Sequence, residues 1–304
     1  MRGDGVLVVA TNPAVDVEWR VAALRPEEKN EVTAERRWPG GKGVNVARWL
    51  GWCGVRARLV LPVGGATGRE LVAGLRRGGI PFRAVPIAGE TRANVVVTTD
   101  PGTQYRLNPT WPVLDGEELE RFEAVLDAEL PRHRWVVLSG ALVRGAPPGF
   151  YRRWATKARN AGAIVVVDCD GEPFRRAVAA RPFLVKPNEF ELAQWAGRPL
   201  TADADRILAA RELAAATAGW VLVSRGAAGA WLTGPGIDGV LVVSAPNTRV
   251  RNTVGAGDAM LASTIAAVMR DPKRPLAWLR AGVRVGSLAT RQEPGTVPAP
   301  KSGF

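Results

Sequence analysis

Short continuous apolar runs alternate with helical patterns along most of the chain. The first run, residues 5–10, reads Gly-Val-Leu-Val-Val-Ala and is typical of a strand buried on both faces of a parallel sheet. Similar runs recur at residues 58–61, 135–138, 163–167, 183–185 and 220–223. Helical patterns separate most of them, and we expect a hairpin from Trp231 to residues 240–243. The alternation predicts an α/β fold with a doubly wound, mostly parallel sheet and helices on both faces.

Two stretches interrupt this alternation. Residues 17–38 and residues 82–107 each contain strand-like segments without an intervening helix. Strand-only stretches inside an α/β chain predict a small separate sheet, which could act as a lid. No repeat, low-complexity segment or long linker divides the chain, so we expect a single domain over residues 1–304 that carries this β lid.

A glycine-rich turn leads directly into an apolar helical segment near the end of the chain. Residues 252–258 read Asn-Thr-Val-Gly-Ala-Gly-Asp, so Gly255 and Gly257 would lie where backbone N–H groups have no helical acceptor. These groups and the positive end of the helix dipole favour a bound phosphate. Asp258 would then lie beside the phosphate and could accept a proton from an attacking hydroxyl. The alternative is a loop without a ligand, with Asp258 as an ordinary helix cap.

A second glycine-rich loop, Pro39-Gly40-Gly41-Lys42-Gly43, leads into another amphipathic helix. Its backbone and Lys42 could bind an anion or a sugar, and Asn45 in the first helical turn could bond a hydroxyl. This loop is not a Walker A motif, because Gly43 follows Lys42 where that motif has Ser or Thr. Residues 252–258 in turn lack the third glycine of a dinucleotide-binding fingerprint.

Polar residues follow several of the predicted strands. Asn12 and Asp16 come after the first strand, where open α/β sheets place their ligands, and could hold substrate hydroxyls. A turn built on Asn12 and the following proline is the alternative. Two further clusters are Lys186, Asn188 and Glu191, and Ser224, Gly226 and Gly229. Asn188 could simply cap a helix and the glycines could form a turn, but their shared place at the carboxyl edge of the sheet favours nucleotide binding.

Composition excludes several classes of site. His133 is the only histidine, which excludes histidine-based triads and multi-histidine metal sites. Cys53 and Cys169 form no Cys-x-x-Cys pair, so we expect each to be a small buried residue. The net charge of +12 is spread along the chain without a dense basic run, which favours an anionic small substrate over nucleic acid. No apolar run could span a bilayer and the start lacks a signal-peptide pattern, so we expect a cytoplasmic protein.

In this order, the motifs resemble the ribokinase-type carbohydrate kinases, the PfkB family. The glycine-rich stretches at residues 39–47 and 252–258 carry the resemblance, which covers nearly the whole chain. The intervening motifs lie at residues 11–16, 89–92, 137–140, 186–191 and 224–229. Within the family, residues 11–14, 64–68 and 253–260 are most similar to the phosphofructokinase and tagatose-phosphate kinase branch. Asn252 departs from the Asp or Ser that the family commonly has there, which affects local ATP or cation contacts rather than the base.

The resemblance implies a role for each matching residue. Asp258 would be the base, and the amides of residues 254–257, which include Gly255, Ala256 and Gly257, would form an anion hole. The acceptor would be held by Asn12, Asp16, Gly40, Gly41, Lys42, Asn45, Arg92, Asn94 and Ser139. The nucleotide would be held by Lys186, Asn188, Glu191, Ser224, Gly226, Gly229, Thr253, Gly255 and Gly257. The implied cofactors are ATP and Mg²⁺, with Glu191 contacting Mg²⁺ through water, and a monovalent cation such as K⁺ could also bind.

Charge favours an acceptor that already carries a phosphate. Lys42 and Arg92, with the weaker candidate Lys29, would have no charge to neutralise on a bare sugar, whereas arginine can bind a phosphate through two parallel hydrogen bonds. The alternative is that Lys42 and Arg92 are surface residues paired with Glu90 or Glu35. We therefore expect ATP-dependent phosphorylation of fructose 6-phosphate or fructose 1-phosphate, with tagatose 6-phosphate next.

Two other functions stay open from the sequence. One is a kinase of an unphosphorylated sugar or a nucleoside, and the other is a non-catalytic regulator that binds a sugar phosphate. The resemblance further implies a homodimer formed through the lid, with neither nucleic acid nor membrane as a partner.

Overall fold

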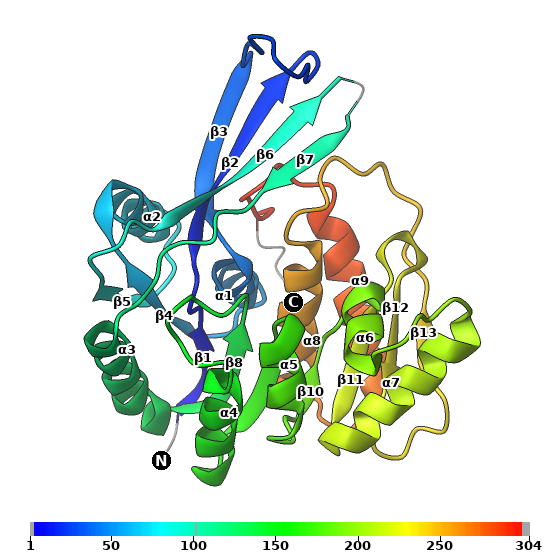
Figure 1. Cartoon of the computed structure of the whole chain (residues 1–304). Helices are drawn as coiled ribbons and strands as arrows, with labels where there is room; N and C mark the ends of the chain where they lie inside the picture. The colour runs from blue at the N-terminus through cyan, green and yellow to red at the C-terminus, as the bar shows by residue number, and fades with distance from the viewer. Residues whose placement is uncertain (1–2, 101, 300–304) are drawn as a thin grey trace.

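A nine-stranded sheet forms the centre of the molecule (Figure 1). The computed structural model describes residues 3–100 and 102–299, so both ends of the domain expected over residues 1–304 lie outside the described residues. The strand order is β13-β12-β11-β10-β9-β8-β1-β4-β5. The strands are β1 (Gly3–Val9), β4 (Ala57–Val63), β5 (Phe82–Pro86), β8 (His133–Ser139), β9 (Ile164–Asp168), β10 (Leu184–Val185), β11 (Trp220–Ser224), β12 (Ala230–Thr233) and β13 (Leu241–Val243). All neighbours are parallel except the β11-β12-β13 meander, so the predicted fold class and hairpin are confirmed.

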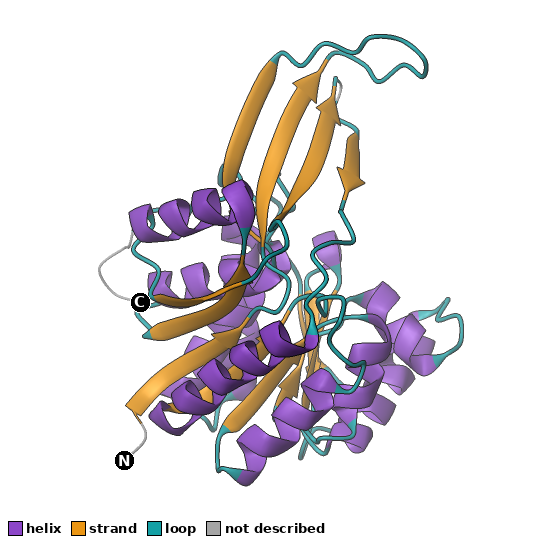
Figure 2. Cartoon of the chain, turned by 60° about the vertical axis from the view of Figure 1, so that its left-hand side comes forward, coloured by secondary structure: helices purple, strands orange, loops and turns teal. Residues whose placement is uncertain are grey.

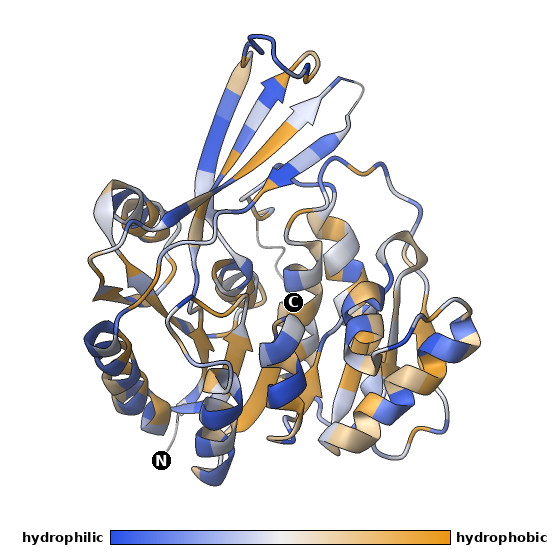
Figure 3. Cartoon of the chain, in the orientation of Figure 1, coloured by the Kyte–Doolittle hydropathy of each residue, from blue (hydrophilic) through white to orange (hydrophobic). Residues whose placement is uncertain are grey.

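Helices cover both faces of this sheet (Figures 1 and 2). One face carries α1 (Lys42–Trp52), α2 (Gly65–Arg77), α8 (Ala256–Arg270) and α9 (Pro275–Ala289). The other carries α3 (Gly116–Glu129), α4 (Phe150–Asn160), α5 (Gly171–Val178), α6 (Glu189–Ala196) and α7 (Asp203–Thr217). Along β1, Val6 and Val8 pack on the first layer, whereas Leu7 and Val9 pack on the second. This alternation explains why the strand reads as a continuous apolar run, and Figure 3 shows the hydrophobic residues gathered in the sheet.

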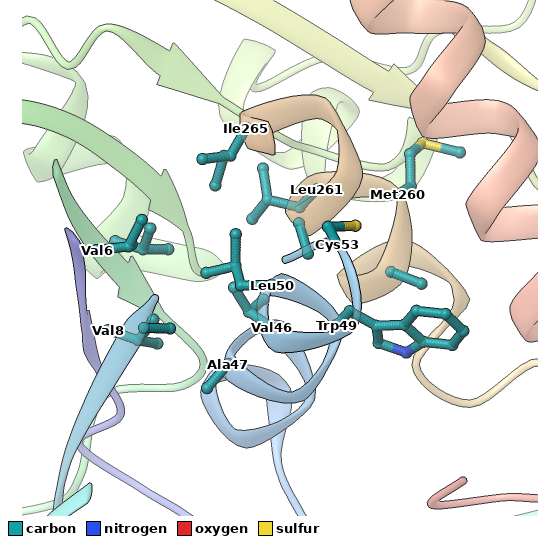
Figure 4. Packing of buried hydrophobic residues seen from close by; sticks show 14 of the residues in the cluster. Val6, Val8, Val46, Ala47, Trp49, Leu50, Cys53, Met260, Leu261 and Ile265 are labelled. Atoms are coloured by element: carbon teal, nitrogen blue, oxygen red, sulfur yellow. The ribbon is translucent and has the colours of Figure 1, made fainter. Parts of the chain in front are cut away.

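Helices α1 and α8 are packed against each other and against the sheet (Figure 4). Val46 and Leu50 of α1 are 0% exposed, as are Leu261 and Ile265 of α8. Burying a side chain of this size contributes roughly 1.5–3 kcal/mol to the free energy of unfolding. The amino-terminal ends of α1 and α8, which carry the two glycine-rich turns, are therefore held in a fixed relation.

A four-stranded sheet projects from this body (Figure 1). Its order is β3-β2-β6-β7, with β2 (Ala14–Val21), β3 (Ala34–Gly40), β6 (Arg92–Thr99) and β7 (Gln104–Leu107). The prediction that residues 82–107 belong to this sheet is wrong for residues 82–86, because β5 pairs in parallel with β4 of the large sheet. Helix α2 connects β4 to β5 as a crossover, so the α/β alternation extends further along the chain than the sequence indicated.

No helix in the described part of the chain combines the length and the apolar character needed to cross a membrane.

Candidate active site

A cavity of about 1000 Å³ lies where the carboxyl ends of the parallel strands meet the small sheet. Ser139 at the end of β8, Asp170 just after β9 and Lys186 just after β10 line it from the large sheet. Arg92 and Asn94 of β6 line it from the small sheet. Ligands of open α/β sheets bind at this edge, so the position alone marks the cavity as a candidate site.

Nearly every residue that the sequence suggested for the site lines this one cavity. The lining includes Asn12, Asp16, Gly41, Lys42, Asn45, Arg92, Asn94, Ser139, Lys186, Asn188, Glu191, Ser224, Gly226, Gly229, Thr253, Gly255, Ala256, Gly257 and Asp258. Gly40 is not part of the lining and packs behind Asp16 instead. Lys29 is also elsewhere, with an 88% exposed side chain 3.8 Å from Glu31 Oε1.

The turn before α8 has the geometry of an anion site. Gly255 caps the helix with φ +78°, a left-handed conformation that favours glycine. Among the described residues, the backbone N–H groups of Gly255, Gly257 and Asp258 have no hydrogen-bond partner. Val254 and Ala256 differ from the expectation that residues 254–257 all donate to an anion. The N–H of Val254 donates to Asn252 Oδ1 at 2.8 Å, and the N–H of Ala256 donates to the carbonyl oxygen of Thr253 at 3.4 Å. These free donors lie at the amino-terminal end of α8, which is the positive end of its dipole and lines the cavity.

Asp258 lies in the first turn of α8 and is 6% exposed. Asn45 Nδ2 donates to its Oδ2 at 2.9 Å. Burial and the negative charge of Asp168 raise the pKa of Asp258 to about 6, against the charges of Lys186 and Lys42 and the hydrogen bond from Asn45. A carboxylate with a pKa near 6 is ionised at neutral pH and is a better proton acceptor than an ordinary aspartate.

Asp16, on β2, brings a second buried carboxylate to the cavity. It is 6% exposed and accepts a hydrogen bond from Asn94 Nδ2 at 2.8 Å. Burial raises its pKa, against the hydrogen bond from Asn94 and the charge of Arg48. Asp16 and Asn94 are register partners on the parallel strands β2 and β6, so the small sheet itself sets their spacing.

Lys42 and Lys186 share one buried carboxylate. Asp168, at the end of β9, is fully buried and lies 3.2 Å from Lys186 Nζ and 3.4 Å from Lys42 Nζ. Burial alone would raise the pKa of Asp168, but the two lysine charges outweigh it and hold the pKa below its usual value. Lys42 Nζ also lies 3.2 Å from Glu191 Oε1, so neither Glu90 nor Glu35 is its partner. Burial alone would lower the pKa of Lys42, but the charges of Asp168 and Glu191 outweigh it and raise the pKa, so Lys42 stays charged inside the cavity.

On the predicted nucleotide side, Asn188 and Glu191 form a capping box at the start of α6. Asn188 Oδ1 accepts from the N–H of Glu191 at 2.8 Å, and Glu191 Oε2 accepts from the N–H of Asn188 at 2.9 Å. The capping alternative is thus present in the structure, and both residues also line the cavity. The box fixes the Glu191 carboxylate, whose remaining lone pairs suit water-mediated contact with Mg²⁺.

Buried polar atoms without a partner gather around the cavity. In the described residues seven such side-chain atoms occur, and five belong to residues at or beside this site: Asn12 Oδ1, Arg92 Nε, Asn94 Oδ1, Ser139 Oγ and Asp168 Oδ2. Unpaired buried polar atoms are costly, so their concentration here indicates a site shaped for a polar ligand.

Three charged residues of the site were not predicted from the sequence. Arg106 of β7 lines the cavity and its Nη2 donates to Thr253 Oγ1 at 3.1 Å, which joins the small sheet to the turn before α8. Asp168 is a polar residue at the end of an apolar strand. The same pattern marked the candidate site residues after other strands. Arg48 lies one helical turn after Asn45 and bonds its side chain, which spacing on α1 could have indicated.

Comparisons with known proteins agree with this geometry. The family model for pfkB family carbohydrate kinases matches residues 7–302. The chain is 30% identical over 296 residues to 1-phosphofructokinase of Bacillus subtilis, covering 96% of this chain and 94% of the relative. It is 33% identical over 295 residues to ATP-dependent 6-phosphofructokinase isozyme 2 of Mycobacterium tuberculosis, covering 93% of this chain and 82% of the relative.

Solved structures of phosphofructokinase-2 from Escherichia coli have the same fold. Its complex with fructose-6-phosphate matches with a TM-score of 0.86 at 29% identity, covering 95% of this chain and 94% of that chain. Its complex with potassium matches with a TM-score of 0.88 at 31% identity, covering 96% and 94%. Its tetrameric inhibited form matches with a TM-score of 0.87 at 31% identity, covering 95% of each chain.

Proposed function

The chain belongs to the pfkB family of carbohydrate kinases, and we propose that it transfers the γ-phosphoryl group of ATP to a hydroxyl of a phosphorylated ketohexose. Fructose 6-phosphate and fructose 1-phosphate are the first candidates for the acceptor, and tagatose 6-phosphate is the next. The observation that carries the proposal is one cavity that joins a buried base, Asp258, to free amides of the preceding turn and to the cationic side chains of Arg92 and Arg106.

In the proposed reaction, Asp258 Oδ accepts the proton of the acceptor hydroxyl. The hydroxyl oxygen forms a bond to the γ-phosphorus as the bond from that phosphorus to the bridging oxygen of ADP breaks. The free N–H groups of Gly255 and Gly257 would stabilise the negative charge that this transfer spreads over the phosphoryl oxygens. Lys42 and Lys186, which both pair with Asp168, would add positive charge to the same region.

The small sheet would supply the acceptor site. Asp16 and Asn94 present a carboxylate and an amide at a fixed spacing, which suits sugar hydroxyls. Arg92 and Arg106 lie on the same sheet and would neutralise the phosphate that the acceptor already carries. Asn12, Gly41, Asn45 and Ser139 would complete this part of the site, while Gly40 leaves room for Asp16.

The opposite part of the cavity would hold the nucleotide. Lys186, Asn188, Glu191, Ser224, Gly226, Gly229 and Thr253 line it there. The described residues contain no group of three or more His, Cys, Asp or Glu side chains able to hold a metal ion. A single carboxylate such as Glu191 nevertheless fits Mg²⁺, which is commonly held by substrate phosphates and water with few protein ligands. When bound, Mg²⁺ would offset the charge of the phosphates, and we include a K⁺ site in the proposal because the E. coli relative was solved with potassium.

We also propose that the small sheet covers the acceptor as a lid and takes part in a homodimer. Its strands and connecting loops expose Leu24, Val32, Tyr105 and Leu107 by 39–57%. Exposed apolar side chains on a projecting sheet suit contact with a second copy of the chain. The E. coli relative has a tetrameric form, which supports self-association of this kind of chain.

The test is ADP release from Mg-ATP with a panel of fructose 6-phosphate, fructose 1-phosphate, tagatose 6-phosphate, fructose and ribose. We expect turnover on a phosphorylated ketohexose and a loss of about 1000-fold or more in the Asp258→Asn variant, because the base is removed. Turnover on fructose or ribose alone would overturn the acceptor proposal. No turnover on any acceptor, with binding of sugar phosphate still measurable by thermal shift, would identify a binding protein instead.

A further inference from the structure

Arg48 of α1 makes two hydrogen bonds that link the small sheet to the proposed base. Its Nη1 donates to Asn45 Oδ1 at 2.8 Å, and its Nη2 donates to the carbonyl oxygen of Pro39 at 2.6 Å. Pro39 lies near the end of β3, the strand that leads from the small sheet into the glycine-rich loop. Asn45 in turn donates from Nδ2 to Asp258 Oδ2 at 2.9 Å. A continuous chain of hydrogen bonds therefore runs from β3 through Arg48 and Asn45 to Asp258.

The chemistry of these groups permits only one orientation of the Asn45 amide. An arginine only donates hydrogen bonds and an ionised carboxylate only accepts them. With Arg48 on one side and Asp258 on the other, the amide oxygen must face Arg48 and the amide nitrogen must face Asp258. The reversed amide would place its oxygen against the Asp258 carboxylate and its N–H₂ group against the guanidinium. Arg48 thus selects the orientation in which Asn45 can hold Asp258.

The surroundings of Asn45 leave it no other strong partner. Asn45 is 6% exposed, and its Nδ2 would lie 3.4 Å from a Cβ placed on Gly255, so the amide packs directly against the turn before α8. One Nδ2 hydrogen serves Asp258, which leaves the second available to an acceptor hydroxyl. A rotation of this amide would therefore disturb the base and the acceptor site together.

Arg48 has no direct ion pair in the described residues, although it carries a charge in a mostly buried position. Burial lowers its pKa, while the charges of Asp16 and Asp258 oppose that effect. A buried charge without a contacting partner is expensive, so a side chain chosen for packing alone would be apolar here. The packing of α1 against α8, which Figure 4 shows for Val46, Leu50, Leu261 and Ile265, holds these groups at fixed separations.

We propose that Arg48 is a positioning residue: by binding the Asn45 carbonyl oxygen and anchoring on Pro39, it orients the Asn45 amide that holds Asp258 in place for proton transfer. The inference rests on the proposed function only in treating Asp258 as the base. It assigns to Arg48 an effect on turnover that passes through Asn45 and does not involve contact with either substrate.

The first test is a double-mutant cycle with Arg48→Met and Asn45→Ala. Methionine keeps an unbranched apolar stem like that of arginine but removes the donors and the charge. A hydrogen bond to a charged group is worth enough to change a rate about tenfold or more, so Arg48→Met should lower kcat by about that factor, with the KM for ATP within about twofold of the parent value. In the Asn45→Ala background the same substitution should change kcat by less than about twofold, because the residue through which it acts is gone. An equal loss in both backgrounds would overturn the proposal.

Arg48→Lys is the conservative variant, and Arg76→Met on the exposed end of α2 is the matched control. Lysine can reach one acceptor but lacks the fork that holds two, so kcat should fall between those of the parent and of Arg48→Met. Arg76→Met should leave kcat unchanged. Equal losses of kcat in Arg48→Met and Arg76→Met, with Arg48→Lys unimpaired, would assign the effect to general loss of charge and overturn the proposal.

A second readout does not depend on turnover and so separates this inference from the proposed function. In protein labelled with ¹⁵N-asparagine, the side-chain signal of Asn45 is identified by its loss in Asn45→Ala. We expect this signal to show a strongly hydrogen-bonded proton in the parent protein and in Arg48→Lys, and to move to a free-amide position in Arg48→Met. An unchanged signal in folded Arg48→Met would overturn the proposal. Absence of turnover on every acceptor would instead contradict the proposed function and leave this result decisive for Arg48.

Discussion

Gly40 lies directly against the carboxylate of Asp16, and a Cβ on Gly40 would be 2.1 Å from Asp16 Oδ2. No side chain fits there unless Asp16 moves, and Asp16 is held on its other side by Asn94. We predict that Gly40→Ala lowers kcat/KM for the acceptor by about 100-fold, because a displacement near 1 Å in a positioning residue can cost that much. Steady-state kinetics with the acceptor varied would measure this, and the KM for ATP should stay unchanged.

Gly51 of the neighbouring helix α1 provides the control for this substitution. A Cβ on Gly51 meets nothing within 4 Å, and the residue is exposed. Gly51→Ala should therefore leave kcat/KM unchanged and raise the free energy of unfolding by about 0.5–1 kcal/mol, since alanine favours a helix over glycine. A similar loss of kcat/KM in Gly40→Ala and Gly51→Ala would contradict a specific effect of Gly40→Ala on Asp16.

The pKa of Asp258, raised to about 6, predicts the acid side of the pH profile. A base must be ionised to accept a proton, and the pKa of the unliganded site governs kcat/KM, so kcat/KM should fall about tenfold for each pH unit below 6 and be level above it. An ordinary aspartate would give this fall near pH 4. Measurement of kcat/KM from pH 4.5 to pH 8.5, with unfolding followed in parallel, would locate the acid limb of the profile, and a profile flat down to pH 5 would contradict the prediction.

The same shift predicts how stability depends on pH. The folded state binds the Asp258 proton more tightly than the unfolded chain does, because the folded pKa is above the ordinary aspartate value of 3.8. The stabilisation from this group is therefore present below about pH 4 and is lost as the pH rises through about 6. Asp258→Asn removes the buried charge, and its melting temperature should exceed that of the parent at pH 8 by more than at pH 5. A difference that is larger at pH 5 would contradict the assignment.

The sequence predicted features that depend on local patterns. Continuous apolar runs predicted the parallel strands because both faces of such strands are buried, as Val6 and Leu7 are on opposite faces of β1. The glycine-rich turn before α8 was predicted because its conformation requires glycine, as the φ of +78° at Gly255 shows. Each of these signals lies within a few neighbouring residues.

Features that depend on the order of strands were not predictable in the same way. Asp168, Lys42 and Lys186 come from three separate elements, and only the adjacency of β9 and β10 and the packing of α1 bring them together. The boundary of the small sheet was also placed too early, because residues 82–86 have a strand pattern that does not reveal which sheet they join. The hydrogen bond from Arg48 to Pro39 depends on how β3 lies beside α1, which the spacing of residues along α1 does not reveal.

Asp168 and Lys186 give a prediction about stability. Asp168 is fully buried, and removing one lysine would leave its charge only partly compensated by Lys42. Lys186→Met should lower the free energy of unfolding by about 3 kcal/mol, as breaking a buried ion pair commonly does. Adding Asp168→Asn to Lys186→Met should recover much of that loss, because the uncompensated charge is then removed. Denaturant unfolding of the four proteins in this cycle would measure the coupling, and additive losses would contradict it.

Arg92 and Arg106 give a prediction about the acceptor. Arg92 Nη2 donates to the carbonyl oxygen of Asn12 at 3.1 Å and its Nε has no partner, whereas Arg106 reaches Thr253 across the cavity. If they bind the acceptor's phosphate, Arg92→Ala and Arg106→Ala should each raise the KM for a phosphorylated ketohexose about tenfold or more. The KM for ATP should change by less than about twofold.

Two comparisons separate phosphate binding from a merely structural effect of these arginines. Arg25→Ala, at a 67% exposed position in the loop between β2 and β3, should have no effect on either KM. With unphosphorylated fructose as acceptor, the arginine variants should lose little relative to the parent, because no phosphate charge is left to neutralise. An equal loss on fructose and on its phosphate esters would show that Arg92 and Arg106 hold the small sheet in place, since lid geometry affects both acceptors alike while a phosphate contact affects only one.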